Sequence, residues 1–93
     1  MPKRRNPYPD WVIERRLALG HRIATIRGRR RFSQDDLAET AGVDRRSIQR
    51  YEAGTRDPRY ADLLLIANAL DIGIAELVQD PAAGAGDRPA AGR

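Results

Sequence analysis

Three arginines and a glutamine stand close together in the middle of the chain. They are Arg45, Arg46, Arg50 and Gln49. The guanidinium group of arginine can bond O6 and N7 of guanine together, and a glutamine amide can pair with adenine in a similar way. At about 100° per residue, a helix would place these side chains on one side and Ser47, Ile48 and Tyr51 on the other. The pattern predicts a helix that packs through its apolar side and can enter a major groove with its polar side.

A second helix is predicted just before this one, because residues typical of helix ends flank an apolar stripe. Ser33 can cap the helix, and Asp35 and Asp36 suit the positive end of the helix dipole. The stripe consists of Leu37, Ala38 and Ala41. Gly42 can adopt the left-handed conformation that ends a helix, and Asp44 can cap the next one. Two short helices joined by a tight turn are therefore expected.

This pair of helices resembles the helix-turn-helix domain of phage repressors and Cro, also called XRE-type regulators. The matching residues are Ser33, Gln34, Leu37, Ala38, 41–43, Ser47, Ile48, Arg50, Tyr51, Glu52, Gly54, Pro58 and 63–70. The resemblance covers roughly residues 17 to 78. It implies an all-α fold, a compact five-helix lambda-repressor-like helix-turn-helix domain, here with an extended first helix. It also implies a sequence-specific transcriptional regulator that binds double-stranded DNA and reads the major groove with helix 44–52.

The resemblance also suggests roles for side chains outside the reading helix. Gln34 matches a family position that binds phosphate, and backbone donors at the start of that helix would reinforce the contact. Residues where the family often contacts the DNA backbone are Thr55, Arg56 and Arg59. Arg27 matches an arginine that forms an ion pair with the acid corresponding to Glu52. The arginine cluster 27–31 could contact phosphate near the start of the helix that Ser33 caps. The alternative for this cluster, for the arginines of the reading helix and for the loop after Gly54 is simple solvation of a charged surface.

Composition bounds the possible partners and compartments. The chain has 93 residues, 41% of them hydrophobic, which suits one small helical domain. Its net charge of +4 favours an anionic partner. Sixteen of its 17 basic residues are arginine, which suits phosphate and guanine, although GC-rich coding would produce the same bias. The sequence has no cysteine, no apolar run long enough to span a membrane and no signal peptide, so we expect a cytoplasmic, nucleoid-associated protein.

The ends of the chain differ in composition from the part between them. Residues 1–9 contain three prolines and three basic residues, which predicts a flexible basic arm, either against DNA or merely solvated. Residues 10–78 are predicted to form the helix-turn-helix domain. Residues 79–93 are rich in Ala, Gly and Pro, which predicts a disordered tail.

The first helix is predicted from Trp11 to about Gly28, with Asp10 as its cap. The part from Trp11 to Arg16 extends beyond the family pattern. Trp11 and Ile13 are expected to pack on the domain, or alternatively on a partner subunit.

The C-terminal half predicts two more helices. Pro58 suits a turn or a first helical position, with Asp57 as a possible cap. A helix over 60–70 would cluster most of its apolar side chains on one side, with Leu65 nearly opposite. The clustered residues are Tyr60, Leu63, Leu64, Ile66, Ala67 and Leu70. Residues 71–78 resemble the short fifth helix of the family, whose apolar residues should close the core and offer a dimer contact.

Catalysis and metal binding are not expected. Ser33 and Ser47, the only serines, are assigned to a cap and to the packing side, so no serine nucleophile stands beside a base. His21 is a lone histidine without cysteines or clustered carboxylates, so no metal site and no cofactor are predicted. The rival function is a protein-interaction module, such as an antitoxin-like partner protein. For the DNA-binding function we expect a homodimer, formed through the fifth helix with Leu65 or through the Trp11 extension.

Overall fold

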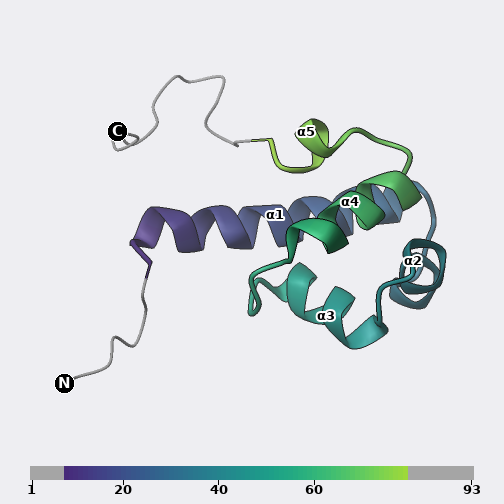
Figure 1. Ribbon diagram of the computed structural model, residues 1–93, viewed down its shortest axis with the longest axis horizontal. Helices are drawn as coiled ribbons and strands as arrows, with labels where there is room; N and C mark the ends of the chain where they lie inside the picture. The colour runs from purple at the N-terminus through teal and green to yellow at the C-terminus, as the bar shows by residue number, and fades with distance from the viewer. Residues whose placement is uncertain (1–7, 80–93) are drawn as a thin grey trace.

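The computed structural model describes residues 8–79, and the predicted arm and tail lie almost entirely outside these residues. The described part is all helical, as the sequence predicts. Five helices follow one another: α1 (Asp10–Arg29), α2 (Gln34–Ala41), α3 (Arg45–Ala53), α4 (Tyr60–Ala69) and α5 (Ile74–Leu77). In Figure 1, α1 runs behind the other helices, with α3 below it, α5 above it and α4 in front. The lambda-repressor-like fold class predicted from the sequence is confirmed.

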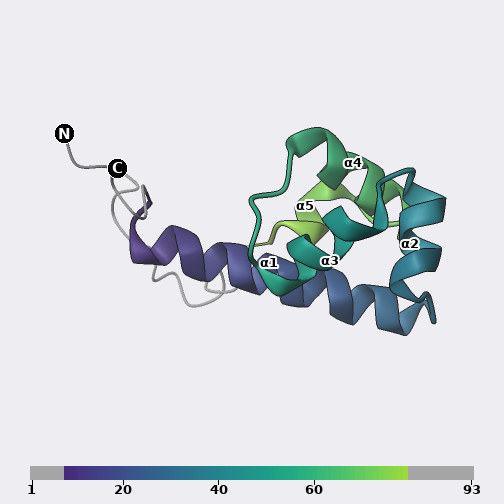
Figure 2. The same cartoon turned by 90° about the horizontal axis from the view of Figure 1, so that it is seen from below.

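Helix α1 is longer than the group of helices that packs against it. Figure 2 shows its N-terminal turns projecting beyond the other four helices. Its start differs from the prediction, because Pro9 occupies the N-cap position without a side-chain bond and Asp10 is already helical. The proline ring holds Pro9 at φ −63°, an extended entry into the helix that leaves Asp10 in the first turn. There its carboxylate complements the helix dipole instead of capping.

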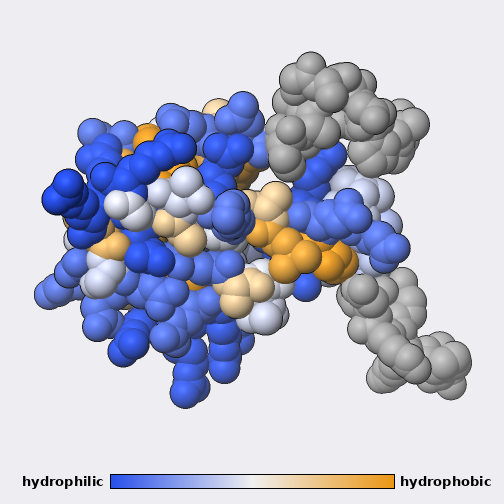
Figure 3. Space-filling view, turned by 180° about the vertical axis from the view of Figure 1, so that it is seen from behind, coloured by the Kyte–Doolittle hydropathy of each residue, from blue (hydrophilic) through white to orange (hydrophobic). Residues whose placement is uncertain are grey.

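At the projecting end of α1, the two side chains that were expected to pack on the domain, Trp11 and Ile13, are only partly buried. The ring is 38% exposed, and the Arg15 guanidinium lies over it at 5.3 Å from the ring centroid. Ile13 is half-buried. Figure 3, which looks onto α1 from behind, shows a hydrophobic patch on this half of the helix. The first turns of α1 therefore present apolar surface beyond the core.

A glycine allows α1 and α3 to approach each other closely. A Cβ atom on Gly20 would lie 2.3 Å from the carbonyl oxygen of Tyr51 and 2.6 Å from that of Glu52. These distances are shorter than any van der Waals contact, so only glycine fits at this crossing. Nothing in the local sequence singles out Gly20, because glycine is required there by a helix far away in the chain.

The core lies between the five helices. Its fully buried members come from every helix and are Ile23, Leu37, Ile48, Tyr51, Ile66, Leu70 and Leu77. The Tyr51 hydroxyl donates a hydrogen bond to Asp62 of α4, which satisfies the polar end of this buried ring. Burial and the Asp62 carboxylate raise the pKa of Tyr51, so the ring stays neutral.

Two expectations for α4 are wrong. The helix begins at Tyr60 with Arg59 at the N-cap position, so Asp57 is not its cap. Tyr60 and Leu64 are 68% and 42% exposed, although the pattern placed them with the buried side chains. The helix is apolar nearly all round, and such a pattern cannot tell which face is buried.

The fifth helix is a single turn, shorter than the segment 71–78 that the family pattern suggests. Gly73 stands at its N-cap position, and Leu77 is its only fully buried residue. Ile72 and Ile74 pack partly against the core, whereas Val78 is 46% exposed. Most of its apolar residues close the core, which leaves α4 with the larger exposed apolar surface.

Candidate nucleic-acid interface

Helices α2 and α3 are joined by a turn whose ends are fixed by the predicted residues. Ser33 and Asp36 form a capping box at the start of α2, with hydrogen bonds of 2.8 and 2.9 Å. Gly42 ends α2 in the left-handed conformation at φ 76°. Asp44 accepts hydrogen bonds from the backbone N–H of Ser47 at 3.0 Å and from its hydroxyl at 2.8 Å. These bonds lower the pKa of Asp44 and hold the start of α3.

The polar side of α3 faces away from the core. All four predicted base-reading side chains are exposed: Arg45, Arg46, Gln49 and Arg50. The opposite side is buried, with Ser47 at 9%, Ile48 at 0% and Tyr51 at 1% exposure. Asp44 is the cap of this helix, as predicted, and the helix ends at Ala53, one residue beyond the predicted range. The arginine side therefore stands on a helix whose other side is anchored in the core.

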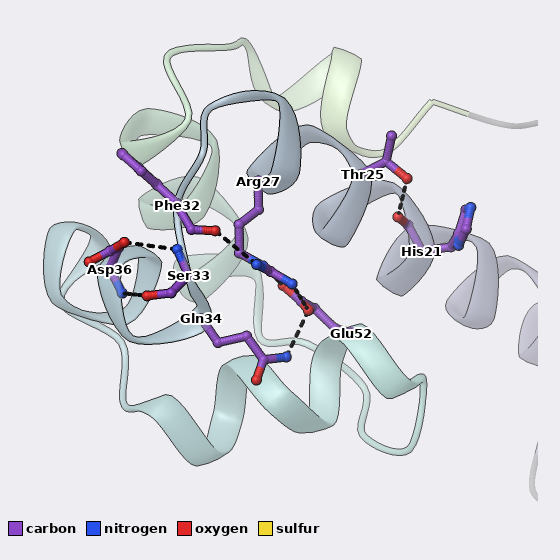
Figure 4. Close-up of polar contacts among 8 residues, drawn as sticks. All are labelled: His21, Thr25, Arg27, Phe32, Ser33, Gln34, Asp36 and Glu52. Carbon is purple, nitrogen blue, oxygen red and sulfur yellow. Dashed lines mark hydrogen bonds and ion pairs between the residues drawn. The ribbon is translucent and has the colours of Figure 1, made fainter.

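One nearly buried carboxylate connects three parts of the fold (Figure 4). Glu52 of α3 accepts hydrogen bonds from Arg27 Nε at 2.6 Å and from Arg27 Nη2 at 3.0 Å. Gln34 of α2 donates a third hydrogen bond to it at 2.8 Å. Arg27 also donates to the backbone carbonyl of Phe32 at 2.8 Å. The network holds α1, α2, α3 and the α1–α2 turn in one arrangement.

This network contains the predicted ion pair and extends it. The Glu52 side chain is 7% exposed and that of Arg27 is 20% exposed. The hydrogen bond with Glu52 raises the pKa of Arg27 above its ordinary value, so the arginine remains charged. Gln34, predicted to bind phosphate, is half-buried and points toward Glu52. The Gln34 side chain thus helps to hold the helices together. Only its remaining amide hydrogen and the backbone are left to bind an anion.

Beside α3 lies a polar groove of about 290 Å³. Four arginines line it: Arg46 and Arg50 from α3, and Arg56 and Arg59 from the loop that follows. Asp44 and Asp62 line it as well, so the groove is not uniformly basic. The structure thus brings two predicted base readers and two predicted backbone contacts together. Thr55 is exposed outside the groove, and its hydroxyl bonds the Arg50 carbonyl at 3.3 Å.

One charged contact between the two helices could not be predicted from the sequence. Asp35 of α2 lies 3.2 Å from Arg45 Nε of α3. Both residues were noted, but for different roles, because no helical spacing relates residues on different helices. In the arginine cluster 27–31, Arg30 pairs with Asp71 at 3.5 Å. Within residues 8–79, no cluster of three His, Cys, Asp or Glu side chains could hold a metal ion, and His21 is exposed.

A capped α2, a glycine turn and an α3 with a buried apolar side define a helix-turn-helix domain of the phage repressor type. The model of the helix-turn-helix family matches residues 23–77, and the chain belongs to this family. The family resemblance stated from the sequence is confirmed. No helix among the described residues is long and apolar enough to cross a membrane.

Comparison with known proteins identifies relatives of the same kind. The chain is 32% identical over 57 residues to an uncharacterised helix-turn-helix-type transcriptional regulator, YqaE, of Bacillus subtilis (strain 168). That match covers 61% of this chain and 49% of the relative, so the chain spans about half of its length. Among solved structures, the restriction-modification controller protein C.AhdI from Aeromonas hydrophila is 34% identical, with a TM-score of 0.64. The match covers 66% of this chain and 92% of that one.

Two further structures share the fold. The hypothetical transcription factor NHTF from Neisseria has a TM-score of 0.68 over 76% of this chain and 82% of its own, at 22% identity, a likeness of fold alone. The apo form of the competence regulator ComR from Streptococcus vestibularis has a TM-score of 0.66 at 26% identity. It covers 83% of this chain but only 25% of that protein.

Proposed function

We propose that this protein is a transcriptional regulator that binds double-stranded DNA and reads its sequence in the major groove. The observation that carries the proposal is the difference between the buried and the exposed side of α3. Its buried side is anchored by Ile48 and Tyr51, while its exposed side presents three arginines and a glutamine. An anchored helix with outward arginines has the geometry that a recognition helix needs.

The proposed contacts fall into two groups. The base readers are Arg45, Arg46, Gln49 and Arg50. The contacts to the DNA backbone are Thr55, Arg56, Arg59 and the start of α2 at Gln34. Because Arg46, Arg50, Arg56 and Arg59 share one groove, base edges and phosphates would be engaged from adjacent positions. The Arg27–Glu52 pair has a structural role, since it holds α3 against α1.

Selection of bound duplexes from a random pool tests this function most directly. We expect one enriched, GC-containing motif, because arginine pairs best with guanine. Affinity for that motif should fall steeply with salt as phosphate contacts release counterions. A pool without enrichment, or a logarithmic salt plot without slope, would contradict the proposal.

We further propose that the DNA-bound form is a homodimer. One recognition helix reads few base pairs, and two-fold dimers extend the site to half-sites about 34–36 Å apart. The surface predicted from the sequence, α5 with Leu65, supports this proposal, since Leu65 and Val78 are 42% and 46% exposed. Tyr60 and Leu64 of α4 are exposed as well, at 68% and 42%. The projecting end of α1 with Trp11 is the alternative contact.

The same exposed apolar surfaces favour a second candidate function, a protein-interaction module of the antitoxin kind. A pull-down from host lysate after nuclease treatment separates the two functions. A stoichiometric protein partner that survives the nuclease supports the interaction module, although such a module can also bind DNA.

A further inference from the structure

Asp35 and Arg45 form an ion pair on the outer edge of the helix-turn-helix unit. Asp35 lies in the first turn of α2, and Arg45 is the first residue of α3. The Oδ1 atom of Asp35 is 3.2 Å from Nε of Arg45, and the two side chains are 68% and 59% exposed. The pair thus stands at the surface where DNA is proposed to bind.

The backbone on both sides of this pair is held by helix caps. Asp36, next to Asp35, bonds the backbone of Ser33 in the capping box. Asp44, next to Arg45, caps α3 through Ser47. The two side chains therefore start from fixed positions, and their meeting does not depend on a mobile loop.

The side of the guanidinium that faces Asp35 determines which nitrogen atoms of Arg45 can still bind a base. The guanidinium has five N–H donors in a rigid plane, and the Asp35 carboxylate lies on its Nε side, at 3.2 Å from that atom. Both Nη atoms remain, and together they form the end of the fork that can bond O6 and N7 of a guanine. The carboxylate also repels phosphate, which turns the guanidinium from the DNA backbone toward the base edges.

We propose that Asp35 is a positioning residue that determines specificity: it orients Arg45 so that this arginine reads a guanine instead of binding phosphate. The inference rests on the proposed function, because it refines one of its base contacts. In the free protein an exposed pair of this kind adds little to stability. On DNA, where water is displaced, the same pair strengthens and limits the geometries open to Arg45. Arg46 and Arg50 differ from Arg45, since they line the groove beside the α3–α4 loop.

The test measures discrimination at a single base pair. The Arg45→Ala variant first identifies the position whose preference depends on Arg45 in the selected motif. Affinities of wild type and Asp35→Ala are then measured on the motif and on duplexes altered at that base pair. For the wild type, the altered base pair should weaken binding by about tenfold. Asp35→Ala should lose most of that discrimination, while its affinity for unrelated DNA stays equal or rises because a negative charge is gone.

Two controls separate orientation from charge and from folding. Glu39→Ala removes the same charge from an exposed position of α2 and should keep the discrimination. In an Arg45→Ala background, Asp35→Ala should have no further effect at that base pair, and melting curves report whether each variant is folded. Full discrimination by a folded Asp35→Ala variant, or an equal change on all sequences, would overturn the proposal while leaving the DNA-binding function intact. A wild type that selects no motif would instead overturn the proposed function and this inference with it.

Discussion

Arg27 and Glu52 join the first helix to the recognition helix through two hydrogen bonds, at 2.6 and 3.0 Å. The carboxylate of Glu52 is 7% exposed and also accepts a bond from Gln34. A buried carboxylate needs such donors, because water cannot replace them at that site. The position of α3 relative to the core thus depends on a charged contact as well as on apolar packing.

Removing the arginine should therefore cost more than removing a surface charge. Arg27→Ala leaves Glu52 with Gln34 as its remaining side-chain donor and should lower the free energy of unfolding by about 2–3 kcal/mol. The raised pKa of Arg27 means that its contribution is complete at all pH values below the ordinary arginine pKa. Urea unfolding at pH 6 and 8 should thus show the same loss. Arg29→Ala, exposed on the same helix, should change stability by less than about 0.5 kcal/mol.

Two glycines of α1 form a matched pair for testing the crossing with α3. Gly20→Ala should destabilise the domain and weaken DNA binding, because the new Cβ would lie 2.3 Å from the Tyr51 carbonyl oxygen and push α3 away. At Gly28 a new Cβ would meet no atom within 4 Å beyond its own neighbouring helix backbone. Gly28→Ala should therefore raise stability by about 0.5–1 kcal/mol, as alanine does in a helix. Equal effects of the two substitutions on melting temperature would contradict the close approach.

Two helix caps should make the fold sensitive to acid. Hydrogen bonds from Ser33 and Ser47 hold the pKa values of Asp36 and Asp44 below the usual 3.8. Since the folded pKa values are the lower ones, this stabilisation is present above the unfolded pKa and is lost as the pH falls through the folded pKa.

Melting temperatures between pH 6 and pH 2 test this dependence. Asp44→Asn keeps a capping side chain that does not titrate, so its melting temperature should fall less than that of the wild type below pH 4. Asp57→Asn, exposed and not a cap, should follow the wild type throughout. If Asp44→Asn and wild type fall in parallel, the cap does not contribute to acid sensitivity.

Substitutions on and beside α3 should separate base contacts from backbone contacts. Arg46→Ala or Arg50→Ala should lose about 1–3 kcal/mol on the selected motif and relax one base position. Arg56→Ala, in the loop, should weaken binding to all sequences alike. Competition between the motif and random duplexes measures this difference. An equal loss of specific and non-specific binding in all three variants would remove the assignment of base readers.

The dimer contact can be located with one substitution in each candidate surface. Leu65→Glu places a charge on the apolar face of α4 and should split the dimer, whereas Trp11→Ala should not. Sedimentation with and without a palindromic duplex reports the stoichiometry. The reverse outcome would assign the contact to the end of α1, and one protein per duplex on the best site would exclude the dimer.

The local elements of the fold could be predicted because their causes are local. Ser33, Gly42 and Asp44 stand at the predicted ends of α2 and α3, since caps and left-handed turns depend on neighbours along the chain. The buried side of α3 could be predicted for the same reason, because its polar and apolar residues alternate with the helical period.

Contacts between distant segments could not be predicted in this way. The ion pair of Asp35 with Arg45 and the crossing at Gly20 depend on how helices pack, which no spacing encodes. The exposed face of α4 was missed because nearly every residue of that helix is apolar, so Tyr60 and Leu64 looked like core residues. The Arg27–Glu52 pair was expected only through the family resemblance, and the role of Gln34 in it was not.

The position of Trp11 gives the projecting end of α1 a fluorescence signal of its own. It is the only tryptophan of the chain, it is 38% exposed, and the Arg15 guanidinium lies 5.3 Å from its ring centroid. The buried aromatic residue of the core is a tyrosine, Tyr51. Tryptophan emission therefore reports on the surroundings of the first turn of α1, separately from the core. A molecule that covers this end would change the emission without any label.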